Sequence, residues 1–123
     1  MENVARILIV EDHEATRETL TLLFQREGFL VSSARTVREA SETFERESPN
    51  VAVIDIGLPD GSGLDLVEAF TAKDPNVRVI VVTAKDGDKL PDEAKKRGAL
   101  TFIQKPYGFR DLLKAVNAVL NRT

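Results

Sequence analysis

The chain has 123 residues, of which 42% are hydrophobic, and its 20 acidic and 17 basic residues give a net charge of −3. This size fits one compact domain over residues 1–123, and the mild negative charge gives no reason to expect direct binding to nucleic acid or to a membrane. The absence of cysteine excludes disulfides, thiolate metal sites and a cysteine nucleophile. No apolar run approaches the roughly 20 residues that span a bilayer, and no signal peptide is visible, so we expect a cytoplasmic protein.

Short apolar runs alternate with longer amphipathic stretches along the chain. In order, the pattern predicts a strand at 6–10, a helix at 14–27, a strand at 30–34, a helix at 36–47, a strand at 51–55, a turn-rich segment at 57–63, a helix carrying Leu66, Val67 and Phe70, a strand at 78–83, a helix at 91–97, a strand at 100–103 and a helix at 109–121. Five strands alternating with five helices predict an α/β protein with a parallel sheet and right-handed crossovers.

The turn-rich segment contains three glycines, at positions 57, 61 and 63. We interpret them as turn glycines that adopt positive φ, rather than as a phosphate-binding loop, because no dinucleotide pattern follows the first strand. In a sheet of this kind, ligands bind outside the carboxyl ends of the strands. The residues that end each strand are therefore the candidates for function.

Polar and charged residues stand at four of these strand ends. Glu11 and Asp12 follow the first strand, Asp55 ends the third, Thr83 ends the fourth and Lys105 follows the fifth. Three carboxylates at one edge repel one another, and a hard divalent cation with oxygen ligands resolves that repulsion. A carboxylate in such a site can act as a nucleophile toward a phosphoryl group and form an acyl phosphate. We assign that role to Asp55, with Lys105 and Thr83 available to contact the phosphoryl oxygens.

These residues also carry a resemblance. Glu11-Asp12, Asp55 within the segment DIGLPDGSG, Thr83-Ala84 and Lys105-Pro106 occur in the order and at the spacing of the receiver domain of two-component response regulators. The resemblance covers essentially the whole chain. It implies a flavodoxin-like, doubly wound sheet of five parallel strands in the order 2-1-3-4-5, with five helices. It also implies phosphorelay signalling, in which a histidine kinase or a phosphotransfer protein supplies the phosphoryl group to Asp55.

The same resemblance implies a metal site for Mg²⁺ or Mn²⁺. Asp12 and Asp55 would bind the ion directly, the backbone carbonyl of Gly57 would complete the protein ligands, and Glu11 would act through a bound water. No other cofactor is expected.

The resemblance further implies a switch. Thr83 would hydrogen-bond a phosphoryl oxygen and Lys105 would pair with the phosphoryl group, next to a cis peptide bond at Pro106. Phe102 stands where the family carries its switch aromatic residue. Phosphorylation would alter the surface around Thr83, Phe102 and the fourth helix, and a homodimer would use the fourth helix, the fifth strand and the fifth helix. Such a domain catalyses its own phosphotransfer and slow dephosphorylation without being a conventional enzyme.

Three other functions remain open alternatives. A pseudo-receiver would bind partners without phosphorylation. A small phosphatase would need a second catalytic aspartate, but Gly57 occupies one of the expected places, and a flavodoxin-like cofactor binder would not carry Glu11-Asp12 in its phosphate loop. The lone His13 is interpreted as a surface residue, because no second histidine exists to build a metal site.

Overall fold

A central parallel sheet organises the protein, and the computed structural model describes residues 4–84 and 90–121 of it. Its strands are β1 (Arg6–Val10), β2 (Leu30–Ala34), β3 (Val51–Asp55), β6 (Arg78–Thr83) and β7 (Thr101–Gln104). They lie in the order β2-β1-β3-β6-β7, and all four pairings are parallel. This arrangement confirms the flavodoxin-like strand order that the resemblance implied.

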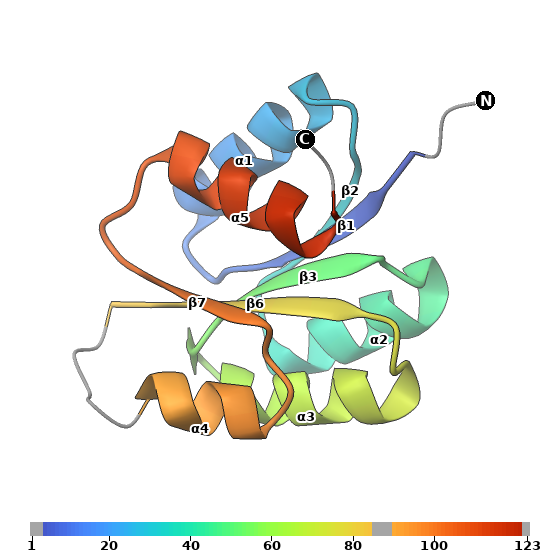
Figure 1. The fold of residues 1–123 in the computed structure, drawn as a ribbon, viewed down its shortest axis with the longest axis vertical. Coiled ribbons are helices and arrows are strands. Elements are labelled where there is room, and N and C mark those ends of the chain that lie inside the picture. Colours follow the sequence, from blue (N-terminus) through green and yellow to red (C-terminus); the bar gives the residue numbers. More distant parts are fainter. Residues whose placement is uncertain (1–3, 85–89, 122–123) are drawn as a thin grey trace.

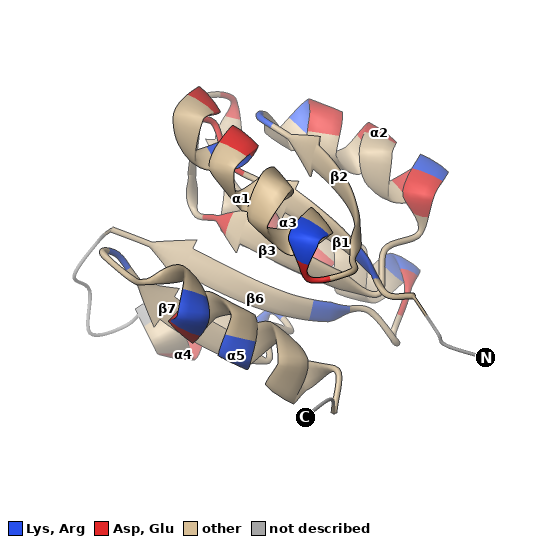
Figure 2. Ribbon diagram, turned by 90° about the horizontal axis from the view of Figure 1, so that it is seen from above, with Lys and Arg blue, Asp and Glu red and all other residues tan. Residues whose placement is uncertain are grey.

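Helices cover both faces of the sheet (Figure 1). One face carries α1 (Glu14–Arg26) and α5 (Phe109–Val119), and the other carries α2 (Val37–Glu47), α3 (Gly63–Lys73) and α4 (Leu90–Lys96). Each layer encloses its own hydrophobic core, because strand residues alternate between the two faces. Figure 2 shows charged residues on the helices and near the strand ends, with the middle of the sheet free of them.

The predicted elements are confirmed with small shifts at their ends. The last strand begins at Thr101 and ends at Gln104, one residue later than expected at each end, and the last helix ends at Val119. Gly28 follows α1 with a φ of 95°, and the Thr36 hydroxyl accepts a hydrogen bond of 3.0 Å from the backbone N–H of Glu39.

Within residues 4–84 and 90–121, no helix combines the length and apolar composition needed to cross a bilayer.

The segment after β3 contains a small hairpin that the sequence did not reveal. It pairs β4 (Gly57–Leu58) with β5 (Gly61–Ser62) in antiparallel fashion. The prediction that its glycines adopt positive φ is wrong, since the positive-φ glycines of the described residues are Gly28 and Gly98. The glycines of this segment do not have positive φ. Any requirement for glycine here must therefore come from a lack of room for a Cβ atom.

Gly63 is the position where space is short. A Cβ atom built there would lie 2.2 Å from the carbonyl oxygen of Asp55 and 2.8 Å from Cγ2 of Ile54. The first turn of α3 therefore packs directly against the end of β3, and glycine permits that approach.

We predict that Gly63→Ala lowers the free energy of unfolding by about 1–3 kcal/mol, because the added methyl group displaces the backbone of Asp55. Gly57→Ala is the matched control, since nothing lies within 4 Å of a Cβ atom at that position. Urea denaturation of both variants checks the prediction, and equal stabilities would contradict it.

Candidate functional site

Asp55 ends β3, between β1 and β6 in the centre of the sheet. The residue is only 8% exposed, and both of its carboxylate oxygens have partners. Oδ1 accepts a hydrogen bond from the Gly57 N–H at 3.1 Å, and Oδ2 accepts one from Nζ of Lys105 at 2.8 Å. The carboxylate is thus fixed in orientation at the carboxyl-terminal end of the sheet, where the strand-end residues meet.

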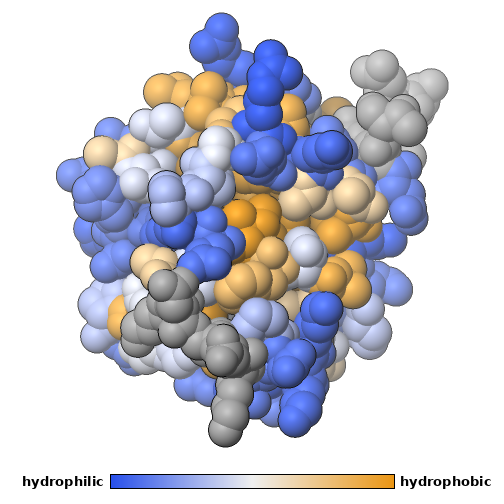
Figure 3. All heavy atoms as spheres, turned by 60° about the vertical axis from the view of Figure 1, so that its left-hand side comes forward, coloured by the Kyte–Doolittle hydropathy of each residue, from blue (hydrophilic) through white to orange (hydrophobic). Residues whose placement is uncertain are grey.

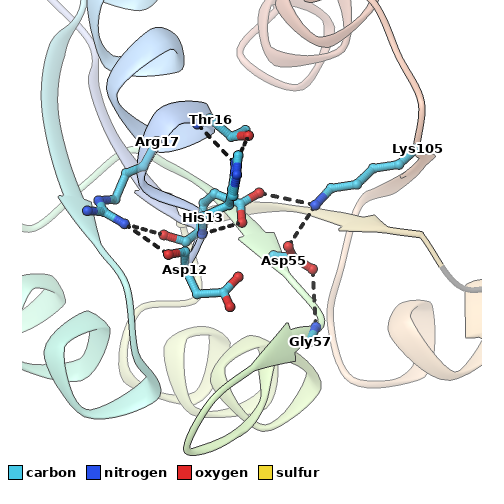
Figure 4. A network of polar contacts seen from close by, with 8 residues as sticks. Asp12, His13, Thr16, Arg17, Asp55, Gly57 and Lys105 are labelled. Atoms are coloured by element: carbon cyan, nitrogen blue, oxygen red, sulfur yellow. Dashed lines mark hydrogen bonds and ion pairs between the residues drawn. The ribbon is translucent and has the colours of Figure 1, made fainter.

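Glu11 and Asp12 follow β1 and approach Asp55 from the neighbouring strand. Glu11 is 4% exposed, and its carboxylate accepts hydrogen bonds from the His13 N–H at 3.0 Å and from Nζ of Lys105 at 3.1 Å. Asp12 is exposed. One carboxylate oxygen from each of Glu11, Asp12 and Asp55 lies within 4.8 Å of the other two (Figure 4). The three carboxylates predicted from the strand ends are therefore brought together.

Lys105 holds the positive charge of this cluster (Figure 4). Burial lowers the pKa of its ammonium group, but hydrogen bonds and attraction to Asp55 and Glu11 outweigh that effect and raise the pKa above its ordinary value. The pKa of Glu11 is also raised, chiefly by burial and further by the charge of Asp55. Lys105 thus offsets part of the repulsion that the buried carboxylates create.

Thr83 and Phe102 occupy the adjacent strands. Thr83 ends β6, is 1% exposed, and accepts a backbone hydrogen bond of 2.8 Å from the Lys105 N–H through its carbonyl oxygen. Phe102 lies in β7, is half-buried, and packs against the core beneath α2, α3 and α4. The Lys105–Pro106 peptide bond is cis, as the resemblance implied.

Two residues that the sequence reading missed as part of this region support the loop after β1. Nδ1 of His13 lies 2.7 Å from the Thr16 hydroxyl and accepts from the Thr16 N–H at 3.4 Å, so this exposed histidine caps α1. Nη1 of Arg17 donates to the carbonyl oxygens of Glu11, at 3.0 Å, and of Asp12, at 3.4 Å. Histidine is not among the usual capping residues, and an arginine on an amphipathic helix carries no sign of such contacts, so the sequence held no clear signal for either role.

A partly apolar groove of about 680 Å³ opens beside Lys105. Its walls include Ala15, Thr19 and Leu23 of α1 on one side and Pro106, Tyr107 and Phe109 on the other. Figure 3 shows hydrophobic side chains at the surface on this side of the molecule. The groove leads from the surface of α1 to the lysine that contacts Asp55.

The donor set of the cluster suits a hard divalent cation. Carboxylate oxygens from Asp12 and Asp55 are the ligands that Mg²⁺ prefers, and the exposure of Asp12 leaves room for waters. The hairpin carrying Gly57 begins two residues after Asp55, so its main chain runs next to the cluster. The residues present therefore fit the metal that the sequence led us to expect.

We predict that Lys105→Met lowers the free energy of unfolding by about 1–3 kcal/mol at about pH 8. Because the folded state raises the pKa of Lys105, its ammonium stabilises the fold at every pH below the unfolded-chain pKa. That stabilisation is lost as the pH rises through the higher, folded-state pKa, so the difference between wild type and variant shrinks at strongly alkaline pH.

Denaturant titrations across this pH range measure the effect. The matched control is Lys114→Met, which removes an exposed lysine of α5. A difference between wild type and Lys105→Met that is independent of pH would contradict the prediction.

Comparison with known proteins agrees with this geometry. The sequence matches the family model of the response regulator receiver domain over residues 7–117. A putative transcriptional regulator of Pseudomonas aeruginosa is 33% identical over 118 residues, which cover 95% of this chain and 57% of that protein. The chain spans little more than half the length of the curated relatives it matches.

Solved structures give the same result. The response regulator receiver domain protein (CheY-like) of Methanospirillum hungatei JF-1 superposes with a TM-score of 0.93 at 33% identity, covering 97% of this chain and 95% of that one. The CheX-CheY-BeF3-Mg+2 complex of Borrelia burgdorferi gives a TM-score of 0.88 at 29% identity, covering 94% and 89% of the two chains. Sequence, fold and strand-end chemistry agree, and the chain belongs to the response regulator receiver domain family of two-component signal transduction.

Proposed function

We propose that this protein is a phosphorylation switch that accepts a phosphoryl group on Asp55 in the presence of Mg²⁺ or Mn²⁺. Receiver domains are signalling switches rather than conventional enzymes, and here the switch would catalyse its own phosphorylation and slow dephosphorylation. The observation that carries the proposal is the position of Asp55, whose oxygens contact Lys105 and the Gly57 N–H beside the carboxylates of Glu11 and Asp12.

In the proposed reaction, a carboxylate oxygen of Asp55 attacks the phosphorus atom of a phosphohistidine. A phosphorus–oxygen bond to Asp55 forms, the phosphorus–nitrogen bond of the donor breaks, and the departing imidazole nitrogen takes up a proton. Lys105 would move from pairing with the Asp55 carboxylate to pairing with the phosphoryl oxygens, since its ammonium already lies 2.8 Å from Oδ2. The Thr83 hydroxyl would donate to another phosphoryl oxygen.

The divalent cation would be held by Asp12, Asp55 and the backbone carbonyl of Gly57, with Glu11 acting through a water. When bound, it supplies positive charge that lets an anionic carboxylate approach an anionic phosphoryl donor. Glu11 has a second role in this proposal, because its direct contact with Lys105 keeps the lysine close to Asp55 before the donor arrives.

The phosphoryl donor would be a cognate histidine kinase or a phosphotransfer protein. The groove beside Lys105 supports this choice, since it offers apolar surface from α1, Pro106 and Phe109 next to the phosphoacceptor. A donor protein seated there would bring its phosphohistidine to Asp55 while covering the apolar walls. The mild negative charge of the domain supports a protein partner rather than nucleic acid.

Phosphorylation would be read out on the face formed by α4, β7 and α5. Movement of Thr83 toward the phosphoryl group would alter the space around Phe102, which is half-buried and packs against the core. The same face, formed by α4, β7 and α5, would form the homodimer. Residues 1–123 would act as one receiver domain in the cytoplasm.

Incubation with Mg²⁺ and acetyl phosphate should add one phosphoryl group at Asp55, because the carboxylate is oriented and its charge is partly offset before the donor binds. Intact-mass spectrometry reads the product, and beryllofluoride gives a parallel NMR titration. Asp55→Asn is the control and should show neither change. Absence of any Mg²⁺-dependent change in the wild type would falsify the switch and favour a phosphorylation-independent interaction module, whereas turnover of an added phosphoester would favour a phosphatase.

Without divalent cations, repulsion among the three carboxylates should lower the free energy of unfolding. In EDTA we expect Asp12→Asn to raise the free energy of unfolding by up to about 1 kcal/mol, because one of the repelling charges is gone. With Mg²⁺ at tenfold above its Kd, the wild type should gain about 1.4 kcal/mol and the variant less.

Thermal denaturation with and without Mg²⁺ gives both values. Asp92→Asn, which changes an exposed aspartate of α4, should keep the full Mg²⁺-dependent gain. An equal gain in Asp12→Asn would exclude Asp12 from the metal site.

A further inference from the structure

The hairpin formed by β4 and β5 is fixed at its base to the phosphoacceptor. The Gly57 N–H donates to Oδ1 of Asp55 at 3.1 Å, and the Gly63 N–H donates to the carbonyl oxygen of Ile56 at 2.8 Å. The Gly57 carbonyl, which is the proposed metal ligand, belongs to β4, the first strand of this hairpin. The position of that carbonyl therefore depends on how the hairpin is held.

The tip of the hairpin is fixed to a different element, the amino end of α2. Asp60 lies in the turn between β4 and β5 and is exposed to solvent. Its Oδ1 accepts a hydrogen bond from the Val37 N–H at 2.7 Å, and its Oδ2 accepts one from the Arg38 N–H at 3.1 Å. These hydrogen bonds, that from Val37 above all, lower the pKa of Asp60, so the residue is ionised at neutral pH.

Capping of α2 does not by itself explain these contacts. The helix already has its own cap, because the Thr36 hydroxyl accepts from the Glu39 N–H. Asp60 accepts hydrogen bonds from the two N–H groups that precede that of Glu39, and it belongs to a segment more than twenty residues away in the sequence. Gly61 adds a packing contact, since a Cβ atom there would lie 3.2 Å from Cγ2 of Val37. The hairpin tip thus rests closely on the first turn of α2.

We propose that Asp60 is a positioning residue for the divalent-cation site, which it serves by fastening the hairpin to α2 and so holding the main chain of Gly57 beside Asp55. This inference rests on the proposed function, because it assigns Asp60 a role toward the metal of that function. With both ends held, the hairpin cannot tilt away from the carboxylates. Without Asp60, the hairpin tip keeps only the packing of Gly61 against Val37, and the Gly57 carbonyl would be free to move away from the carboxylates.

The test is metal affinity measured in the absence of any phosphoryl donor. Mn²⁺ binding followed by electron paramagnetic resonance gives the Kd for wild type, Asp60→Asn and Asp60→Ala. We expect Asp60→Ala to weaken Mn²⁺ binding by about tenfold, the size of effect typical of residues that orient metal ligands. Asp60→Asn keeps one oxygen acceptor and should lose less. Amide hydrogen exchange at Gly57 should become faster in Asp60→Ala.

Asp74→Ala is the matched control. Asp74 also accepts a backbone N–H through its carboxylate, from Asn76 at 2.9 Å, but it lies between α3 and β6, at the opposite end of the strand from Thr83. Its loss should cost comparable stability and leave the Mn²⁺ Kd and the Gly57 exchange rate unchanged. A role for Asp60 in folding alone would make the two alanine variants behave alike, and that result would overturn the inference.

Metal binding and phosphorylation of the wild type distinguish the role of Asp60 from the proposed function. If wild type binds Mn²⁺ and is phosphorylated, but Asp60→Ala has the wild-type Kd, the inference about Asp60 fails and the proposed function stands. If wild type itself neither binds the metal nor accepts a phosphoryl group, the proposed function fails and takes the role of Asp60 with it.

Discussion

Lys105 lies between the buried carboxylates of Glu11 and Asp55, and the chemistry of the site depends on this pairing. Carboxylates buried this close to one another are costly unless a cation and hydrogen bonds compensate them. Lys105 is 94 residues from Glu11 and 50 from Asp55, so the contact joins three separate parts of the chain at one edge of the sheet. The parallel sheet makes it possible, because the carboxyl ends of β1, β3 and β7 point to the same edge.

The compensation is incomplete, which fits a site that binds and releases other groups. Asp12 adds a third carboxylate within 4.8 Å, and the raised pKa of Glu11 reflects the burial of its charge. Proteins commonly give up stability at functional sites in this way. Around the carboxylates, main-chain contacts fix the loops: Arg17 binds the carbonyls of Glu11 and Asp12, and Asp60 fastens the hairpin to α2.

The sequence predicted the fold well because its signals are local and repeated. Apolar β-branched runs and amphipathic stretches alternate, and that pattern leaves few topologies for a parallel sheet. The interpretation of the hairpin glycines failed for a physical reason. Composition indicates that a segment turns, but it does not show which glycine has no space for a side chain. At Gly63 a Cβ atom would lie 2.2 Å from the carbonyl oxygen of Asp55, which belongs to the end of β3. The β4–β5 hairpin escaped prediction because it has only two residues in each strand.

The amino-acid sequence by itself determined the order of strands and helices and the set of residues at the strand ends, because hydrophobic periodicity and the residue types at each strand end are written locally in the chain. The tertiary structure alone decided which atoms meet. It assigned the Lys105 ammonium to Glu11 as well as Asp55, gave His13 the cap of α1, and brought Asp60 to the amino end of α2. The contacts of Lys105 and Asp60 join residues that are distant in sequence, and only the packing of the helices and loops around the sheet sets the distances between them. The cap by His13 is local, but histidine is not among the usual capping residues, so only the structure revealed it.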